Sequence, residues 1–215
     1  MMVGRNGAER TAAGLKAFAV LAAPFYINDF ANIWIADFAA WLAIDYLLKA
    51  FVLAAAGIML ARGTLTWRGL GLVKIGPARF IGWTAAMTAI GLILDQYAYG
   101  LLEWLPSWKL GGYPGKPGTW LYTFDLWFGL ALVALTEELV FRGLAWNALK
   151  PVLQSTAAVY AASALLFGLI HWSLGLPAII VTALIGAVFM VCIHRTGSIW
   201  PVAAAHFIVN LVYFW

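Results

Sequence analysis

Charged residues are scarce in this sequence: Asp, Glu, Lys and Arg make up 10% of its 215 residues, whereas hydrophobic residues make up 64%. Soluble domains carry roughly 25% charged residues. So few charges could not cover the surface of a water-soluble globule of this size, which excludes a cytosolic enzyme. Disorder is excluded too, because it requires low hydrophobicity and high charge. The mean hydropathy of +0.90 therefore indicates a polytopic membrane protein.

Cysteine is nearly absent, and so are several catalytic signatures. The single Cys192 forbids a disulfide within the chain and any cysteine-based zinc cluster. The sequence has no His-Glu-x-x-His zinc motif, no Gly-x-Ser-x-Gly nucleophile motif and no Gly-x-Gly-Asp aspartate motif. We expect no metal and no cofactor, although two histidines and a glutamate could in principle hold zinc. We also expect no nucleic-acid partner, because the net charge of +4 is not clustered on a soluble segment.

Long apolar runs fill most of the chain, and roughly 20 such residues span a bilayer as a helix. The runs predict seven spans, at about 16–35, 42–61, 79–102, 121–149, 153–172, 176–194 and 198–215. The first is the least regular, because Pro24, Asn28 and Asp29 interrupt it. The predicted fold class is an all-α, polytopic membrane helix bundle of about seven transmembrane helices. We divide this integral membrane domain into N-terminal helices and loops, 1–119, and a C-terminal four-helix core, 120–215.

The basic residues predict an orientation in the bilayer, since cytoplasmic loops are rich in Lys and Arg. With the N-terminus in the cytoplasm, ten of the thirteen lie on the inner side. These ten are Arg5, Arg10, Lys16, Arg62, Arg68, Lys74, Arg79, Arg142, Lys150 and Arg195. We therefore expect a multi-pass protein of the cell membrane whose N-terminus is cytoplasmic and whose C-terminus is outside.

Two loops differ from the spans in composition. Residues 62–78 are basic, and we interpret them as an inner connector that faces lipid headgroups. Residues 106–118 are rich in Gly and Pro, which predicts an irregular outer connector.

Ionisable groups inside a span are costly and usually face a partner or a cavity. Asp45 and Lys49 are four residues apart, so they can pair on one helix face, and we give them a structural role. Glu138 and Arg142 have the same spacing and should form an ion pair. Glu137 points about 100° away from Glu138 and has no cation at that spacing. A carboxylate placed in this way can act as a general base.

Two later motifs each place two chemically useful groups one helical turn apart. Phe167 and His171 share a predicted helix face, and so do His206 and Asn210. An imidazole and a carboxamide can both donate hydrogen bonds to one developing oxyanion. Alone, the first motif would indicate only an interfacial histidine, and the second only hydrogen bonds between helices. Depth estimates at 1.5 Å per residue allow Glu137, His171 and His206 to meet within the membrane.

Together these motifs resemble the CPBP family of intramembrane proteases, which includes the type II CAAX prenyl endopeptidases and bacteriocin-processing or self-immunity proteins. The family pattern is Glu-Glu-x-x-x-Arg, then Phe-x-x-x-His, then His-x-x-x-Asn. The chain supplies Glu137, Glu138, Arg142, Phe167, His171, His206 and Asn210 in this order, and the resemblance covers about 120–215.

The resemblance implies glutamate-dependent hydrolysis of a peptide bond inside the membrane. Glu137 and His171 would activate a water, and His206 and Asn210 would stabilise the oxyanion. Glu138, Arg142 and Phe167 would support the site. The partners would be the bilayer and a peptide or protein substrate, including a lipidated or membrane-anchored one.

Two other functions use the same residues. In a proton-coupled transporter or channel, the Glu and His residues would relay protons. In a self-immunity or scaffold protein of the same fold, they would have no catalytic role.

Overall fold

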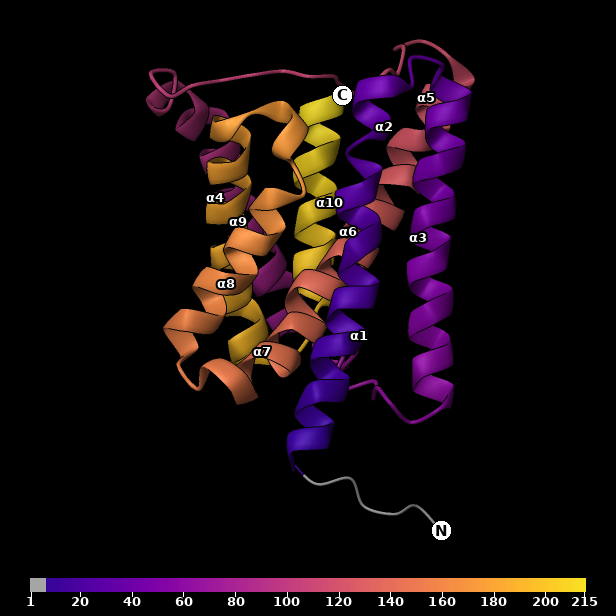
Figure 1. Cartoon of the computed structure of the whole chain (residues 1–215). Coiled ribbons are helices and arrows are strands. Elements are labelled where there is room, and N and C mark those ends of the chain that lie inside the picture. Colours follow the sequence, from indigo (N-terminus) through magenta and orange to yellow (C-terminus); the bar gives the residue numbers. More distant parts are fainter. Residues whose placement is uncertain (1–6) are drawn as a thin grey trace.

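A computed structural model describes residues 7–215, and every regular element in this range is a helix (Figure 1). The elements are α1 (Gly7–Asn28), α2 (Ala31–Trp34), α3 (Phe38–Ala61), α4 (Pro77–Leu101), α5 (Trp120–Phe124), η1 (Asp125–Gly129), α6 (Leu130–Glu138), η2 (Leu139–Leu144), α7 (Ala145–Leu153), α8 (Thr156–Leu169), η3 (Trp172–Leu174), α9 (Leu176–Thr196) and α10 (Trp200–Phe214). The short elements η1 and η2 are π-helical, and η3 is a 3₁₀ turn. The predicted all-α bundle is confirmed. Arg5, which entered the orientation argument, lies outside the described residues.

Five of the seven predicted spans each correspond to one helix, and the fourth corresponds to a nearly continuous run of helical elements over 120–153. The first covers most of α1 and the short α2, which are separated at Asp29 and Phe30. Two boundaries differ from the prediction. The first helix starts at Gly7 rather than near residue 16, because the polar residues before the apolar run are mostly good helix formers. The fifth ends at Leu169, which leaves His171 in the turn that follows rather than on the helix.

Within residues 7–215, three helices are long and apolar enough to cross a membrane: α3, α4 and α9. Two further helices, α8 and α10, are apolar but shorter. These lengths fit a helical membrane bundle. The number of crossings stays a prediction.

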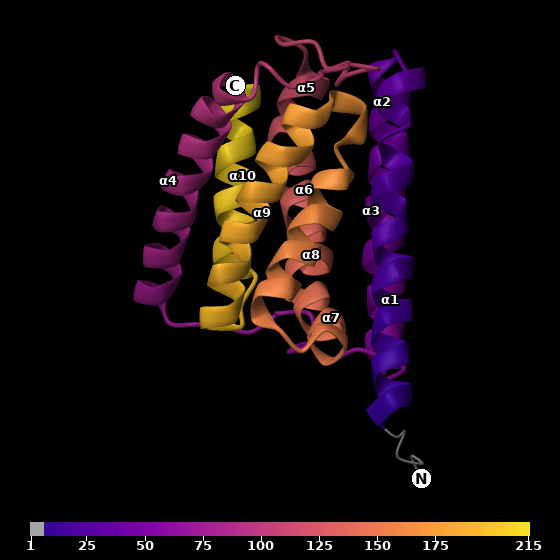
Figure 2. The ribbon, with the colours of Figure 1, turned by 60° about the vertical axis from the view of Figure 1, so that its left-hand side comes forward.

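The helices pack around the stretch from α5 to α7 (Figure 2). α10 lies against α4 and α6, and α8 packs on α9. α1 covers α7 and η2, with α3 beside it. The bundle's end where α1 begins also holds the α3–α4 and α9–α10 connections, whereas α10 ends at the opposite end (Figure 1).

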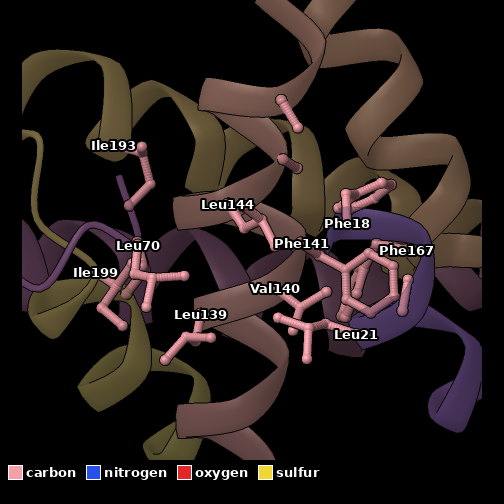
Figure 3. Packing of buried hydrophobic residues seen from close by; sticks show 14 of the residues in the cluster. Phe18, Leu21, Leu70, Leu139, Val140, Phe141, Leu144, Phe167, Ile193 and Ile199 are labelled. Atoms are coloured by element: carbon pink, nitrogen blue, oxygen red, sulfur yellow. The ribbon is translucent and has the colours of Figure 1, made fainter. Parts of the chain in front are cut away.

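The core centres on Phe141, which is fully buried in η2 (Figure 3). Its ring makes edge contacts with Phe25 of α1 at 5.4 Å and with Phe167 of α8 at 5.6 Å between ring centroids. Offset and edge-to-face pairs of this kind add to the energy of burial. The residues that follow Glu137 and Glu138 in the chain are therefore fixed between α1 and α8.

The loop 62–76 corrects one interpretation, because it is more than a connector at the headgroups. Leu70 in this loop is fully buried, and the backbone N–H of Ile199 donates to the carbonyl of Gly71 at 2.9 Å. A side chain at Gly143 would collide with the Leu70 carbonyl, since its Cβ would lie 2.0 Å away. The loop thus closes the end of the bundle, while Arg62 and Arg68 remain exposed.

Candidate active site

Two adjacent glutamates end α6 and point in different directions, as helix geometry predicts. Glu138 is fully buried among neighbouring helices, whereas Glu137 is 8% exposed and lines a cavity. The π-helical turn η2 starts at the next residue. Such turns are frequent at functional sites because they re-aim the side chains next to them.

The predicted pair between Glu138 and Arg142 is present, with Arg142 Nε 3.1 Å from Glu138 Oε2. This is a charge contact rather than an aligned hydrogen bond, and Nη1 and Nη2 have no acceptor among the described residues. The guanidinium instead stacks on the ring of Phe167, 3.8 Å from its centroid, with Phe189 5.7 Å away. A planar guanidinium binds to ring faces in this way. Phe167 therefore covers Arg142.

Gly186 of α9 provides the space for this stack. A Cβ at this position would lie 3.1 Å from Phe167 Cδ1 and 3.2 Å from Arg142 Nη2.

His206 of α10 lies between the two glutamates. Its Nδ1 is 2.8 Å from Glu138 Oε1, and its Nε2 is 3.8 Å from Glu137 Oε2. A carboxylate only accepts hydrogen bonds, so the proton must be on Nδ1. Glu138 thus fixes the orientation of the His206 ring and turns its Nε2 toward Glu137, a contact that sequence reasoning did not predict.

His171 lies in the turn after α8, not on the helix. Its Nδ1 donates to the carbonyl of Phe167 at 3.3 Å, which leaves the lone pair on Nε2 free. Its ring meets the ring of Phe167 at 5.3 Å between centroids. The four-residue spacing from Phe167 therefore brings the two groups together through a turn.

One cavity of about 240 Å³ brings the predicted residues together. It is lined by Glu137, Arg142, Phe167, His171, His206 and Asn210. Glu138 lies behind this wall, bonded to His206. Asn210 is one helical turn beyond His206 and makes no hydrogen bond with any described residue, so its amide is free to bind a ligand.

Sequence reasoning missed a second polar group on the same cavity, centred on Asp125 of η1. Asp125 is 4% exposed, although its place near a predicted span end suggested a boundary residue. Tyr46 and Tyr113 donate to its two oxygens at 2.7 and 2.6 Å. Burial, and then the bond to Asp125, raises the pKa of Tyr113, which belongs to the loop between α4 and α5. The phenol therefore stays a donor.

The predicted Asp45–Lys49 ion pair is present and buried next to Asp125, and Asn28 also donates to Asp45, at 2.7 Å. Both members of the pair line the cavity. Asp29, which sequence reasoning named only as an interruption of the first span, is another buried acid, and it accepts a hydrogen bond from the turn that carries His171. Within residues 7–215, no group of three or more His, Cys, Asp or Glu side chains is arranged to hold a metal ion.

Comparison with protein families finds a match in the C-terminal part of the chain. Residues 119–212 match the family described as Type II CAAX prenyl endopeptidase Rce1-like. The C-terminal part of the chain, somewhat less than half of its length, is similar to this family. No curated protein and no solved structure matches the chain.

The Rce1-like segment begins one residue before α5 and ends within α10. It contains every residue of the three motifs, whereas α1, α3 and α4 lie outside it. The match agrees with the CPBP resemblance. At the level of the family, it supports an intramembrane endopeptidase of the CAAX type that acts on a protein substrate. With the apolar helices α3, α4 and α9, it identifies a membrane protein.

Proposed function

We propose that the chain is a glutamate-dependent intramembrane endopeptidase in which Glu137 is the general base. One observation carries the proposal: Glu137, His171, His206 and Asn210 converge on a single cavity inside the helix bundle. The Rce1-like match supports peptide hydrolysis, and the geometry of the cavity supports the roles of the individual residues.

Water activation is the role of Glu137 and His171. Glu138 is occupied by Arg142 and His206, whereas Glu137 has no Lys or Arg within ion-pair distance in the described part of the chain. A water in the cavity can donate one proton toward Glu137 and the other toward the Nε2 of His171. Its oxygen attacks the scissile carbonyl carbon as Glu137 takes the proton. Positioned proton transfer of this kind contributes roughly 10²–10⁴-fold to a rate.

Oxyanion stabilisation is the role of His206 and Asn210. With a proton on each ring nitrogen, His206 donates Nδ1–H to Glu138 and Nε2–H into the cavity, where the Asn210 amide is a second donor. The removal of one such donor costs roughly 10²–10³-fold in kcat. When the intermediate collapses, Glu137 returns its proton to the amine nitrogen, and the carbon–nitrogen bond breaks.

The supporting residues hold the side chains of His206 and His171 in place. Arg142 pairs with Glu138, Glu138 accepts from His206, and Phe167 covers Arg142 while its carbonyl accepts from His171. We assign the chemistry to 120–215. The helices within 1–119 enclose it, because α1 packs on η2 and α4 packs on α9 and α10.

We further propose seven crossings of the cell membrane with a cytoplasmic N-terminus. The arrangement of the bundle supports an odd number of crossings, since α1 begins at one end and α10 ends at the other (Figure 1). Arg79 at the start of α4 donates to the carbonyl of Arg195 at 3.1 Å, so two basic residues lie together at the proposed inner end.

A prenylated peptide that ends in a CAAX sequence is the first substrate to test, because the family description names this class. The purified protein is reconstituted in liposomes with a farnesylated, internally quenched CAAX peptide, and cleavage is followed by fluorescence and mass spectrometry. We expect cleavage by the wild type, loss of about 10²–10⁴-fold in Glu137→Gln, and full activity in the exposed control Glu103→Gln.

Two results would overturn the proposal: equal cleavage by Glu137→Gln and wild type, or no hydrolysis either of the CAAX peptide or of membrane-inserted leader and tail peptides tested after it. Proton flux through the liposomes without cleavage would favour the transporter instead.

A further inference from the structure

The turn that carries His171 is not held by a helix. α8 ends at Leu169 and α9 begins at Leu176, and the intervening turn, which includes the 3₁₀ element η3, closes only backbone hydrogen bonds between residues three apart. The His171 N–H donates to the Gly168 carbonyl at 3.0 Å, and the Leu174 N–H donates to the His171 carbonyl at 3.1 Å. A side chain on such a turn needs an external anchor to stay in place.

Asp29, in the N-terminal part of the sequence, provides a buried anchor for this turn. It lies between α1 and α2, is 4% exposed, and reaches a residue 144 positions away. Its Oδ2 accepts from the backbone N–H of Ser173, and its Oδ1 accepts from the Ser173 hydroxyl and from the Asn32 amide, each at 2.7 Å. Ser173 is fully buried.

The carboxylate form of Asp29 is suited to this task. It accepts three hydrogen bonds and has no Lys, Arg or His within ion-pair distance in residues 7–215, so its bonds go to neutral donors. Charge-assisted hydrogen bonds are roughly twice as strong as neutral ones. An Asn at this position has one acceptor oxygen and could not accept from the Ser173 N–H and hydroxyl through two oxygens.

The other hydrogen bonds that reach the turn from outside are made to its backbone carbonyls. Trp108 Nε1 donates to the Trp172 carbonyl at 2.8 Å, and the Leu110 N–H donates to the Ser173 carbonyl at 3.0 Å. Both come from the loop between α4 and α5. Asp29 is the group that binds the N–H and the hydroxyl of Ser173, two residues after His171.

We propose that Asp29 is a positioning residue for His171. By fixing Ser173, it holds the His171 turn against the cavity and keeps the imidazole in reach of the water bound at Glu137. This inference rests on the proposed role of His171. A displacement of about 1 Å of a catalytic group costs on the order of 10²-fold in rate.

A double-mutant cycle on kcat separates positioning from general stability. The variants are Asp29→Asn, His171→Ala and the double variant, assayed in liposomes with the farnesylated CAAX peptide. We expect Asp29→Asn alone to lower kcat about 10–100-fold, with KM changed less than about threefold. In the His171→Ala background, the same change should lower kcat less than about threefold. An equal loss in both backgrounds would overturn the proposal.

A spectroscopic readout makes the test independent of cleavage. The chain has three histidines, so ¹⁵N-histidine labelling of the protein in detergent micelles gives few imidazole signals. Asp29→Asn should shift or broaden the His171 signals and leave those of the exposed His194 unchanged. Unchanged His171 signals would contradict the positioning role even if the proposed protease activity is real. If Asp29→Asn shifts the His171 signals but the wild type cleaves no peptide, the proposed function would be contradicted and the contact between Asp29 and the His171 turn would stand.

Two further variants complete the design. Asp37→Asn is the matched control, because Asp37 is exposed and caps α3 through Ala40 N at 2.9 Å, and it should change neither readout. If Asp29→Asn does not accumulate as folded protein, Ser173→Ala removes only the hydroxyl bond. It should lower kcat about 3–10-fold, again only when His171 is present.

Discussion

Arg142 offers a sharp test of how the site is held together. The side chain is fully buried, 3.1 Å from Glu138 and stacked on Phe167. In the variant Arg142→Ala, Glu138 keeps its bond to His206 but loses the only cation within ion-pair distance besides that histidine among the described residues. We therefore expect a large loss of stability together with a loss of activity.

The expected magnitude follows from these contacts. Removal of one partner of a buried ion pair costs about 3–5 kcal/mol, because the other charge is left uncompensated. The stack on Phe167 contributes about 0.5–2 kcal/mol of attraction, which overlaps with the first figure. We expect the free energy of unfolding to fall by about 3–5 kcal/mol. When Glu138→Gln is added to Arg142→Ala, part of this lost free energy of unfolding should return. The coupling energy between the two substitutions should be about 1–3 kcal/mol.

Unfolding in mixed micelles, followed by tryptophan fluorescence and circular dichroism, measures these differences. Arg79→Ala is the matched control, since this arginine is exposed and should leave stability near that of the wild type. A loss below about 1 kcal/mol in Arg142→Ala, or additive effects of the two substitutions, would refute the role of the pair. A stable but inactive Arg142→Ala protein would instead point to direct catalysis by Arg142.

Three further predictions test the packing, the second polar group and the chemistry. Gly168→Ala should lower the free energy of unfolding by about 1–3 kcal/mol, because its Cβ would lie 2.4 Å from the Ile179 carbonyl, whereas Gly82→Ala, with nothing within 4 Å, should not lower it. Asp125→Asn should cost about 1–3 kcal/mol in a thermal unfolding assay, and an unchanged midpoint would show that the bonds from Tyr46 and Tyr113 are dispensable. Cleavage of the CAAX peptide should persist in a chelator, and loss of activity that zinc restores would favour a metal enzyme.

Local spacing predicted the parts of the site that lie on one helix. Glu138 and Arg142 are four residues apart, so their contact follows from helix geometry alone. The divergence of Glu137 from Glu138 follows in the same way. The bundle itself was predictable from hydropathy, because a bilayer demands long apolar helices.

Contacts between distant segments could not be predicted from the sequence. The bond from His206 to Glu138 spans 68 residues, and that from Ser173 to Asp29 spans 144. The role of Asp125 was missed because its tyrosine partners lie on α3 and on the loop before α5, away from its own helix. The end of α8 before His171 was also missed, since hydropathy does not mark where a buried helix gives way to a turn.

The most direct test of the central claim, that Glu137 activates water for peptide hydrolysis, is a single-turnover reaction in H₂¹⁸O with the farnesylated CAAX peptide. The wild type should place one ¹⁸O atom in the new C-terminal carboxylate. Glu137→Gln should form this product about 10²–10⁴-fold more slowly, although the variant remains folded. Labelled product formed by Glu137→Gln at the wild-type rate would contradict the account.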